Sequence, residues 1–292
     1  ESAGGYGASE QKLLRLNEDV LSWLPGDPSP ERLRLLVSLR ALYAAAVKPR
    51  ERRRCAAEIQ HIAATLGKPE ALLQARLESA IEAWEGCRYA EAVAGFDLCL
   101  ADDHAWARPD ILSKAHFLRT LSLVRLGNLA ATQEAVRKLG EFAADVGDPV
   151  LGLYADCFFP GGFAHMRGDL QSALAHVARG AVEAAELGSR HASGAPFVQR
   201  FHLRAFMGEW EALQTMWVHW LRGGSAQQRS AVAWSAALLG DMATANEQLD
   251  QLASGELSIP DDRMRMIVLS HFGEAAALAG RIDLAERLYQ DL

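Results

Sequence analysis

The sequence predicts an all-α protein, an α-solenoid built from antiparallel helical hairpins. Three observations lead to this prediction. Apolar residues recur at three- and four-residue steps, single glycines separate segments of helix length, and those glycines return at a nearly constant spacing. The chain has 292 residues, half of them hydrophobic. A solenoid reaches such a length by adding repeats, because each repeat packs only on its neighbours.

The glycines form two interleaved series. Members of the first series are separated by steps of 41, 41, 40, 32 and 40 residues. They are Gly86, Gly127, Gly168, Gly208, Gly240 and Gly280. A second series, Gly67, Gly147 and Gly188, falls about halfway between members of the first. Two such series favour a tetratricopeptide-like right-handed superhelix of about six hairpins over residues 68–292.

The last segment, residues 261–292, shows the pattern most clearly. Gly280 separates two stretches with apolar residues at helical steps, such as Phe272 in the first and Leu288 in the second. Glycine inside a helix is unfavourable, so Gly273 is expected to mark a close approach of two helices. Gly168 is expected to do the same.

The N-terminal part is expected to lead into these repeats. Residues 1–8 are rich in glycine and are expected to be mobile. Residues 9–67 are expected to form three helices, at about 9–24, 31–48 and 49–66. The third begins with a cluster of arginines, which we interpret as a solvated surface or, alternatively, as a docking place for an acidic partner domain. The cluster is Arg50, Arg52, Arg53 and Arg54.

From Gly67 onward the helices are expected in pairs. Proline suits the first turn of a helix, where its missing N–H has no helical partner to lose, and Asn128, Asp169 and Asp241 follow their glycines as N-caps. The expected pairs are about 69–86 with 88–102, 109–126 with 128–146, 149–167 with 169–187, 196–207 with 209–223, 226–239 with 241–254, and 262–279 with 281–292.

One region breaks this regularity. Pro160 is followed by two glycines inside an expected helix, and a proline there frees the carbonyl of Asp156. Residues 189–196 are rich in turn-forming types, so the next helix is expected to begin only at Pro196.

Aromatic and basic residues surround this irregular region. Aromatic walls beside freed backbone groups suit a pocket for a small molecule or a peptide. The alternative is a kink that only sets curvature, with the aromatics as packing. The candidate ligand-binding residues are Phe158, Phe163, His165, Phe197, Arg200, Phe201, His202 and Trp234.

Composition argues against several classes of function. The net charge is −7 and no long basic tract is present, whereas a nucleic-acid-binding surface needs a basic face. No apolar run has the length of a membrane span. Four scattered cysteines indicate reduced thiols and a cytoplasmic location. We therefore expect neither direct nucleic-acid binding nor membrane insertion.

Motifs of catalysis are also missing from the sequence. No glycine-rich phosphate loop and no Gly-x-Ser-x-Gly motif occurs. His271 and Glu274 share a helix face, but no second histidine completes a metal-binding spacing. We expect a protein that is not an enzyme and that uses no cofactor and no metal.

Several segments resemble the C-terminal helical-repeat region of large bacterial regulators. The N-terminal segments are Pro30-x-x-Leu33-x-Leu35-Leu36, Ala56-Ala57-Glu58-Ile59 and Leu66-Gly-Lys-Pro69. The C-terminal segments are Glu274-Ala-Ala-Ala-Leu-Ala-Gly280 and Ala285-Glu-x-Leu-Tyr289. In those regulators a signal-transduction ATPase is coupled to a LuxR-type or antibiotic-regulator DNA-binding domain, or to a nucleotide cyclase. The sequence departs from the family pattern in three places: alanine follows Gly208 one residue early, no alanine stands at the fifth position after Gly127, and one repeat is only 32 residues long.

The resemblance implies a sensor and docking module that holds the ATPase closed until an effector or partner binds. We therefore expect a non-catalytic sensor or protein-interaction domain that controls a linked ATPase or output domain. Its partners would be another protein or neighbouring domains of the same polypeptide, with a small molecule or a peptide as effector. Because the chain begins at Glu1 and stops inside an expected helix, we expect it to be a piece of a larger protein. The alternative is a pure protein scaffold or oligomerisation module without a small-molecule pocket.

Overall fold

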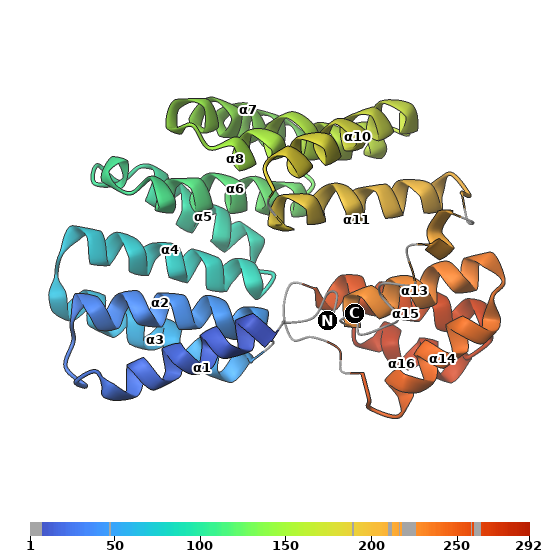
Figure 1. The fold of residues 1–292 in the computed structure, drawn as a ribbon, viewed down its shortest axis with the longest axis horizontal. Helices are drawn as coiled ribbons and strands as arrows, with labels where there is room; N and C mark the ends of the chain where they lie inside the picture. The colour runs from blue at the N-terminus through green and yellow to red at the C-terminus, as the bar shows by residue number, and fades with distance from the viewer. Residues whose placement is uncertain are drawn as a thin grey trace. The chain divides into compact units, whose positions relative to one another are not determined.

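A computed structural model describes residues 8–46, 48–188, 190–209, 212–215, 217, 226–257, 259 and 264–292. In this part of the chain all regular secondary structure is helical, which confirms the predicted class. The chain divides into two compact units (Figure 1). Unit 1 comprises Glu1–Glu18, Leu42–Pro49 and Arg204–Leu292, and unit 2 comprises Asp19–Ala41 and Arg50–Leu203.

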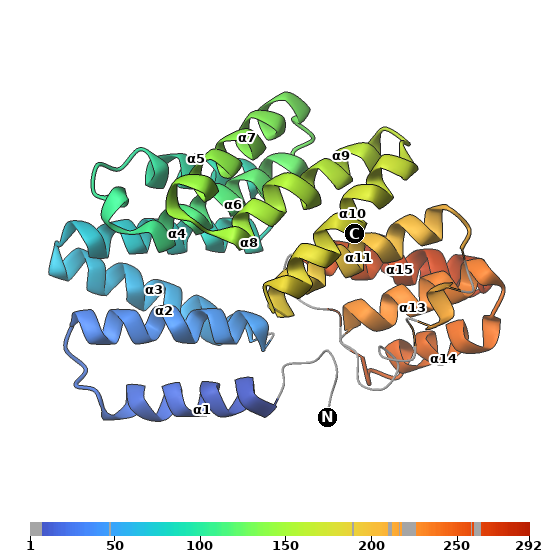
Figure 2. The same cartoon turned by 45° about the horizontal axis from the view of Figure 1, so that its top comes forward.

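Unit 2 contains a series of helices in which α4 to α8 each pack against the next helix and α9 packs against α10. Figures 1 and 2 both show α2, α4 and α6 side by side in that order. The helices are α2 (Pro30–Ala45), α3 (Pro49–Leu66), α4 (Pro69–Glu85), α5 (Tyr89–Leu100), α6 (Pro109–Arg125), α7 (Leu129–Val146), α8 (Pro149–Leu153), α9 (Phe159–Met166), α10 (Leu170–Glu186) and α11 (Arg190–Phe206). A 3₁₀ turn, η1 (Ala105–Ala107), precedes α6, and a π-helical segment, η2 (Tyr154–Phe158), joins α8 to α9.

Unit 1 contains a second series near the C-terminus. There α13 packs against α14 and α15, and α15 packs against α16. The bounds are α13 (Ala226–Leu239), α14 (Met242–Ala253), α15 (Arg265–Leu278) and α16 (Ile282–Gln290); α1 (Ala8–Trp23) begins in unit 1 and ends in unit 2. The predicted helix 149–167 is divided into α8, η2 and α9, and α11 begins at Arg190 rather than at Pro196. The other helices begin and end within three residues of the predicted bounds. The predicted helix 209–223 and the mobile segment 1–8 fall largely outside the described residues.

The predicted glycines end helices as expected, with one exception. Every other member of both series has a positive φ, the left-handed conformation that terminates a helix at little cost only for glycine. At Gly86 φ is −82° and the next residue, Cys87, has the positive φ of 59° instead. A non-glycine residue in this conformation is strained.

The predicted N-caps of three helices are confirmed. The side chains of Asn128, Asp169 and Asp241 accept hydrogen bonds of 3.1 Å from the amides three residues later. Each bond satisfies an amide that the helix itself leaves without a partner. The sequence therefore specifies these helix starts locally, one residue after each turn glycine.

Close helix contacts occur at other glycines than those predicted. A Cβ added to Gly95 of α5 would lie 2.8 Å from the Cβ of Ala80 in α4, and one added to Gly180 would lie 3.0 Å from the Cβ of Cys157. The predictions for Gly273 and Gly168 are wrong. A Cβ at either position meets no atom within 4 Å, and Gly168 is needed for its turn, with φ of +76°.

The late start predicted for α11 is also wrong. The helix begins at Arg190, and Pro196 lies inside it. Pro196 is buried, and its Cγ lies 3.6 Å from the position of a Cβ on Gly180. Packing of the proline ring on α10 offsets the loss of one backbone hydrogen bond. Local turn propensity is overruled by this tertiary contact.

We predict opposite effects of alanine at two glycines. Gly95→Ala should lower the free energy of unfolding by about 1–3 kcal/mol, because α5 must move away from Ala80. Gly273→Ala should raise it by about 0.5–1 kcal/mol, because the new methyl group is unobstructed and alanine favours the helix. Urea denaturation followed by circular dichroism measures both. Equal shifts of the same sign would contradict the assignment of the contacts.

We also predict a pH dependence that comes from His116 of α6. Its ring stacks on Phe142 with centroids 4.8 Å apart, and burial, with a smaller contribution from nearby Arg119 and Lys138, lowers its pKa to about 4. The unfolded chain protonates His116 near pH 6.5. Between those values the unfolded state binds more protons, so stability falls with falling pH, by about 1–2 kcal/mol from pH 7 to pH 5.

The measurement compares urea denaturation of the wild type and His116→Gln at pH 7 and pH 5. The variant should lose this part of the acid sensitivity. The same pH dependence in both proteins would exclude His116 as its source.

Candidate functional site

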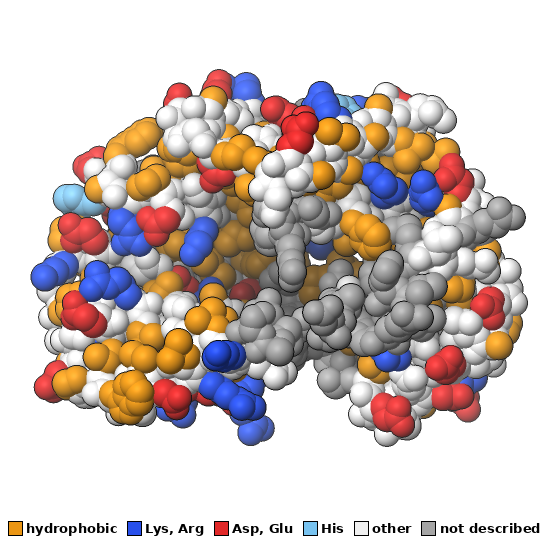
Figure 3. Space-filling model, viewed as in Figure 1, with side chains coloured by type: hydrophobic (Ala, Val, Ile, Leu, Met, Phe, Trp, Pro, Cys, Tyr) orange, Lys and Arg blue, Asp and Glu red, His pale blue; other side chains and the backbone are white. Residues whose placement is uncertain are grey.

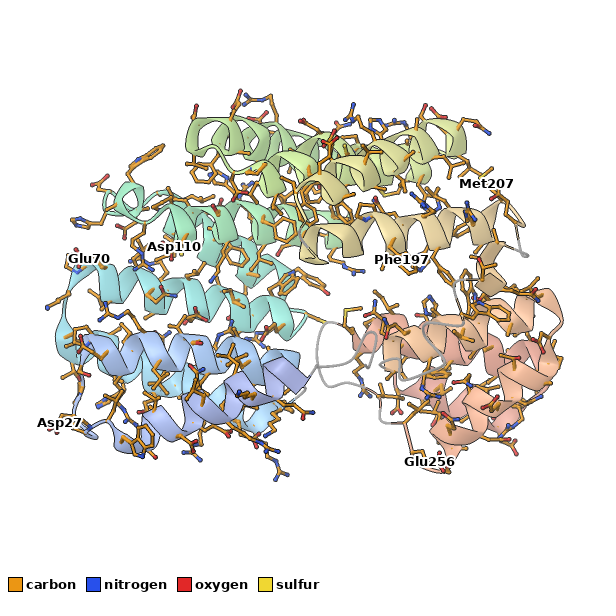
Figure 4. The ribbon with its side chains drawn as sticks, viewed as in Figure 1. Asp27, Glu70, Asp110, Phe197, Met207 and Glu256 are labelled. Atoms are coloured by element: carbon orange, nitrogen blue, oxygen red, sulfur yellow. The ribbon has the colours of Figure 1, made fainter. Side chains whose placement is uncertain are left out.

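A groove of about 560 Å³ opens on unit 2 where α2, α4 and α6 begin. Its floor is apolar and includes the buried Leu33 and Ala71 with the half-buried Val37 and Leu66. Figure 4 shows Glu70 of α4 and Asp110 of α6 at the same edge of this unit. Alternate helices of this series, α2, α4 and α6, therefore border the same groove.

The rim of the groove is charged and mainly basic. The basic side chains are Arg34, Lys68, Arg108 and Lys114, and the acidic ones are Glu70 and Asp110. In the space-filling view this edge, at the left, carries basic and acidic side chains together (Figure 3). The lining has two more positive than negative charges, although the whole chain has a net charge of −7.

The basic residues differ in how they are engaged. Arg34 pairs with Glu31 at 2.9 Å, and Arg108 pairs with Asp110 at 2.8 Å. Lys68 and Lys114 form no ion pair with any residue that the structure describes. Both lysine side chains are exposed at the rim.

Arg108 is held in place by several contacts. Its Nε and Nη2 donate to the two carboxylate oxygens of Asp110 at 2.9 and 2.8 Å, and Nη2 also donates to Gln74 Oε1 at 2.9 Å. Asp110 accordingly has a pKa below its usual range, mainly because of these hydrogen bonds. Within the described residues Nη1 of Arg108 has no acceptor, so one edge of a fixed guanidinium is left for a ligand.

Gln74 links the groove to a buried ionic network. Its Nε2 donates to Glu78 Oε1 at 2.8 Å, and Arg40 of α2 donates to the other oxygen of Glu78. Arg40 Nη1 also lies 3.2 Å from Glu85 Oε2. The side chains of Arg40, Glu78 and Glu85 are at most 5 % exposed.

The network extends to α3 through Arg52. Its Nη2 donates to Glu82 at 3.2 Å, and its Nε lies 3.2 Å from Glu85 Oε2, without the alignment of a hydrogen bond. Of the arginines that the sequence placed on a solvated surface, Arg52 is thus buried, a correction to that interpretation. Because Glu82 and Glu85 lie on the next helix, a local sequence pattern does not reveal their pairing with Arg52.

The predicted break at Pro160 takes the form of a π-helical turn. The carbonyl of Asp156, which the sequence predicts to be freed, accepts a hydrogen bond from Arg179 of α10. Gln199 of α11 donates to the carbonyl of Phe158 at 2.8 Å. Side chains of the protein therefore occupy the backbone groups that the sequence suggested for a ligand, and sequence analysis missed both Arg179 and Gln199.

Three of the predicted aromatic wall residues are engaged in packing. Phe163 belongs to the core cluster of unit 2, Phe158 packs against that cluster, and Phe201 is fully buried. Phe197 is 37 % exposed and Arg200 is half-buried. The ligand pocket predicted at these residues stays a prediction. Phe163 and Phe201 are buried in the protein's own packing, whereas part of the Phe197 side chain is accessible to solvent.

The two histidines of that prediction lie near each other. Burial lowers the pKa of His202, with a further contribution from His165, and the carbonyl of Val198 opposes the shift. Trp234, the remaining candidate residue of that predicted pocket, belongs to unit 1. There its Nε1 donates to Glu274 at 2.8 Å and its ring stacks on His271 at 5.1 Å.

Other chemistry has little support in the described residues. These contain no cluster of three His, Cys, Asp or Glu side chains that could hold a metal ion. Burial raises the pKa of Cys55 and of Cys99 to about 11, which keeps both thiols protonated. No described helix is long and apolar enough to cross a membrane.

Comparison with known proteins adds no identification. No family model matches the chain, and no curated protein matches it significantly.

We predict that the ionic network is a major contributor to stability. Arg40→Met should lower the free energy of unfolding by about 3–5 kcal/mol, because Glu78 and Glu85 are left buried without their cation. Arg137→Met is the matched control, since Arg137 also pairs with two glutamates but is half-exposed. Its melting midpoint should be nearly unchanged. Similar losses in both variants would contradict the role of burial.

Proposed function

We propose that this chain is a non-catalytic sensor or protein-interaction domain of a bacterial transcriptional or signalling regulator, located in the cytoplasm. It binds an effector or partner on the surface of a tetratricopeptide-like solenoid and thereby controls a linked ATPase or output domain. The resemblance of its terminal segments to such regulators motivates the regulatory part of this proposal.

The solenoid arrangement is supported by how the helices follow each other. Helices α4 to α8 each pack on the next helix, α8 and α9 both pack on η2, and α9 packs on α10. In the same way α13 packs on α14, and α15 packs on α16. Glycine in the left-handed conformation ends most of these helices. Antiparallel hairpins that stack into a right-handed superhelix satisfy both observations.

The groove on unit 2 is the observation that carries the binding function. It joins three helices and combines an apolar floor with two exposed lysines that form no ion pair with a described residue. Structural packing alone does not require such a combination. The alternative is a scaffold or oligomerisation module, which would use other surfaces and leave the groove empty.

Site-specific photo-cross-linking tests the proposal. A benzoylphenylalanine in place of Glu70, an exposed residue of the groove rim, should give a defined adduct in cells that make the protein. The same substitution at Lys138, an exposed residue of α7 paired with Glu134, should not. An adduct within the polypeptide indicates a neighbouring domain, and a larger one indicates a separate partner. Identical adducts from both positions, or none from the groove, would contradict a binding function of the groove.

A further inference from the structure

We propose that the groove of unit 2 binds an extended acidic peptide segment, with apolar side chains on the floor and carboxylates on the rim. This inference rests on the proposed binding function and specifies its ligand. The argument uses the charge, the exposure and the span of the groove.

The charge of the groove opposes that of the whole protein. Four basic and two acidic side chains line it, whereas the chain has a net charge of −7. An acidic ligand is repelled by most of the surface and attracted here, which favours both correct docking and fast association. The side chains of Lys68 and Lys114 form no ion pair or hydrogen bond with a described residue, although Lys114 lies near enough to Asp110 to help lower the pKa of that carboxyl. A ligand carboxylate therefore has no direct protein contact of these two side chains to displace.

Arg108 adds a hydrogen-bond donor of fixed orientation to the exposed ammonium groups of Lys68 and Lys114. Asp110 and Gln74 orient its guanidinium, and its Nη1 has no acceptor among the described residues. A pre-oriented guanidinium loses little side-chain entropy when it binds a carboxylate. Lysines adapt to carboxylates at several positions. Together these donors suit a chain of acidic side chains more than one anion of fixed shape.

The shape of the groove favours a peptide segment over a small molecule. Its volume alone would fit either. The rim residues Arg34, Lys68 and Lys114 are exposed, however, whereas small-molecule sites bury most of their ligand. Helices pack about 8–10 Å apart, so the groove spans roughly 16–20 Å from α2 to α6. An extended peptide covers this distance with about five or six residues.

The apolar floor gives the second half of the recognition. Leu33, Val37 and Leu66 offer an uncharged surface between the basic groups. Side chains of an extended segment alternate in direction. A sequence that alternates apolar and acidic residues therefore places one set on the floor and the other at the rim.

Fluorescence anisotropy with the full chain tests this proposal. The probe is a fluorescein-labelled octapeptide of alternating leucine and glutamate, and the control peptide has glutamine in place of glutamate. The acidic probe should bind at least tenfold more tightly than the control, and its affinity should fall as salt is raised. Equal binding of both peptides, or no binding of the acidic probe, would overturn the proposal.

Three variants locate the binding. Lys68→Glu and Lys114→Glu should each weaken binding of the acidic probe at least tenfold, and Val37→Asp should weaken binding of both peptides. Lys138→Glu changes the net charge equally but lies on α7, so it should leave the affinity unchanged. Equal losses of affinity in all variants, including Lys138→Glu, would show that binding depends on the net charge and not on the groove, and would overturn the proposal. Melting midpoints measured in parallel confirm that each variant is folded.

Competition separates the peptide from other anions. Inorganic phosphate or a glutamate dipeptide, at millimolar concentration, should not displace the probe at constant ionic strength. Displacement by either would overturn the peptide proposal in favour of a small anion. In that case the cross-link from position 70 still decides independently whether the groove binds a partner, so the two proposals can fail separately.

Discussion

Two guanidinium groups and three carboxylates meet between α2, α3 and α4, and the arrangement of these helices depends on their pairing. Arg40 and Arg52 face Glu78, Glu82 and Glu85, with most of these side chains hidden from water. Removal of charges from water costs several kcal/mol per ion unless partners replace the solvent. A shift of α4 by one turn relative to α2 would separate Arg40 from both of its carboxylates. We infer that the network selects one register among packings that apolar residues alone would permit.

The groove depends on the same network through one residue. Gln74 is buried, and its side-chain amide forms two hydrogen bonds. The nitrogen Nε2 donates to Glu78, and the oxygen Oε1 accepts from Arg108. The position of Arg108 at the groove is therefore tied to the interior pairing of α4. The interior cluster has one more negative than positive charge, so a basic rim nearby is also electrostatically favourable. Structure and candidate function thus share one set of polar contacts.

Sequence reasoning succeeded where local chemistry decides the structure. Turn glycines and caps such as Asn128 act within a few residues, so they can be found by pattern. It failed where distant segments decide. Gly273 has the sequence context of a helix contact but faces open space, whereas Gly95 touches Ala80 of the preceding helix. Pro196 lies inside a helix because its ring packs on α10. The groove was missed for the same reason, since Lys68 lies in the turn before α4 and Lys114 lies in α6, and together they form no motif.

Polar backbone groups at the π-helical turn already have partners within the protein, whereas the lysine side chains at the groove are exposed to solvent. Pro160 does free a carbonyl, and that observation suggested a ligand site near the turn. Arg179 and Gln199 bind the carbonyls of Asp156 and Phe158, however, so a ligand there must break hydrogen bonds within the protein. Such an exchange gives little net energy, because one satisfied bond replaces another. At the groove, the side chains of Lys68 and Lys114 form no hydrogen bond or ion pair with a described residue that a ligand would have to break. Binding energy is therefore more readily gained at the groove than at the turn, although the turn is the greater irregularity in the sequence.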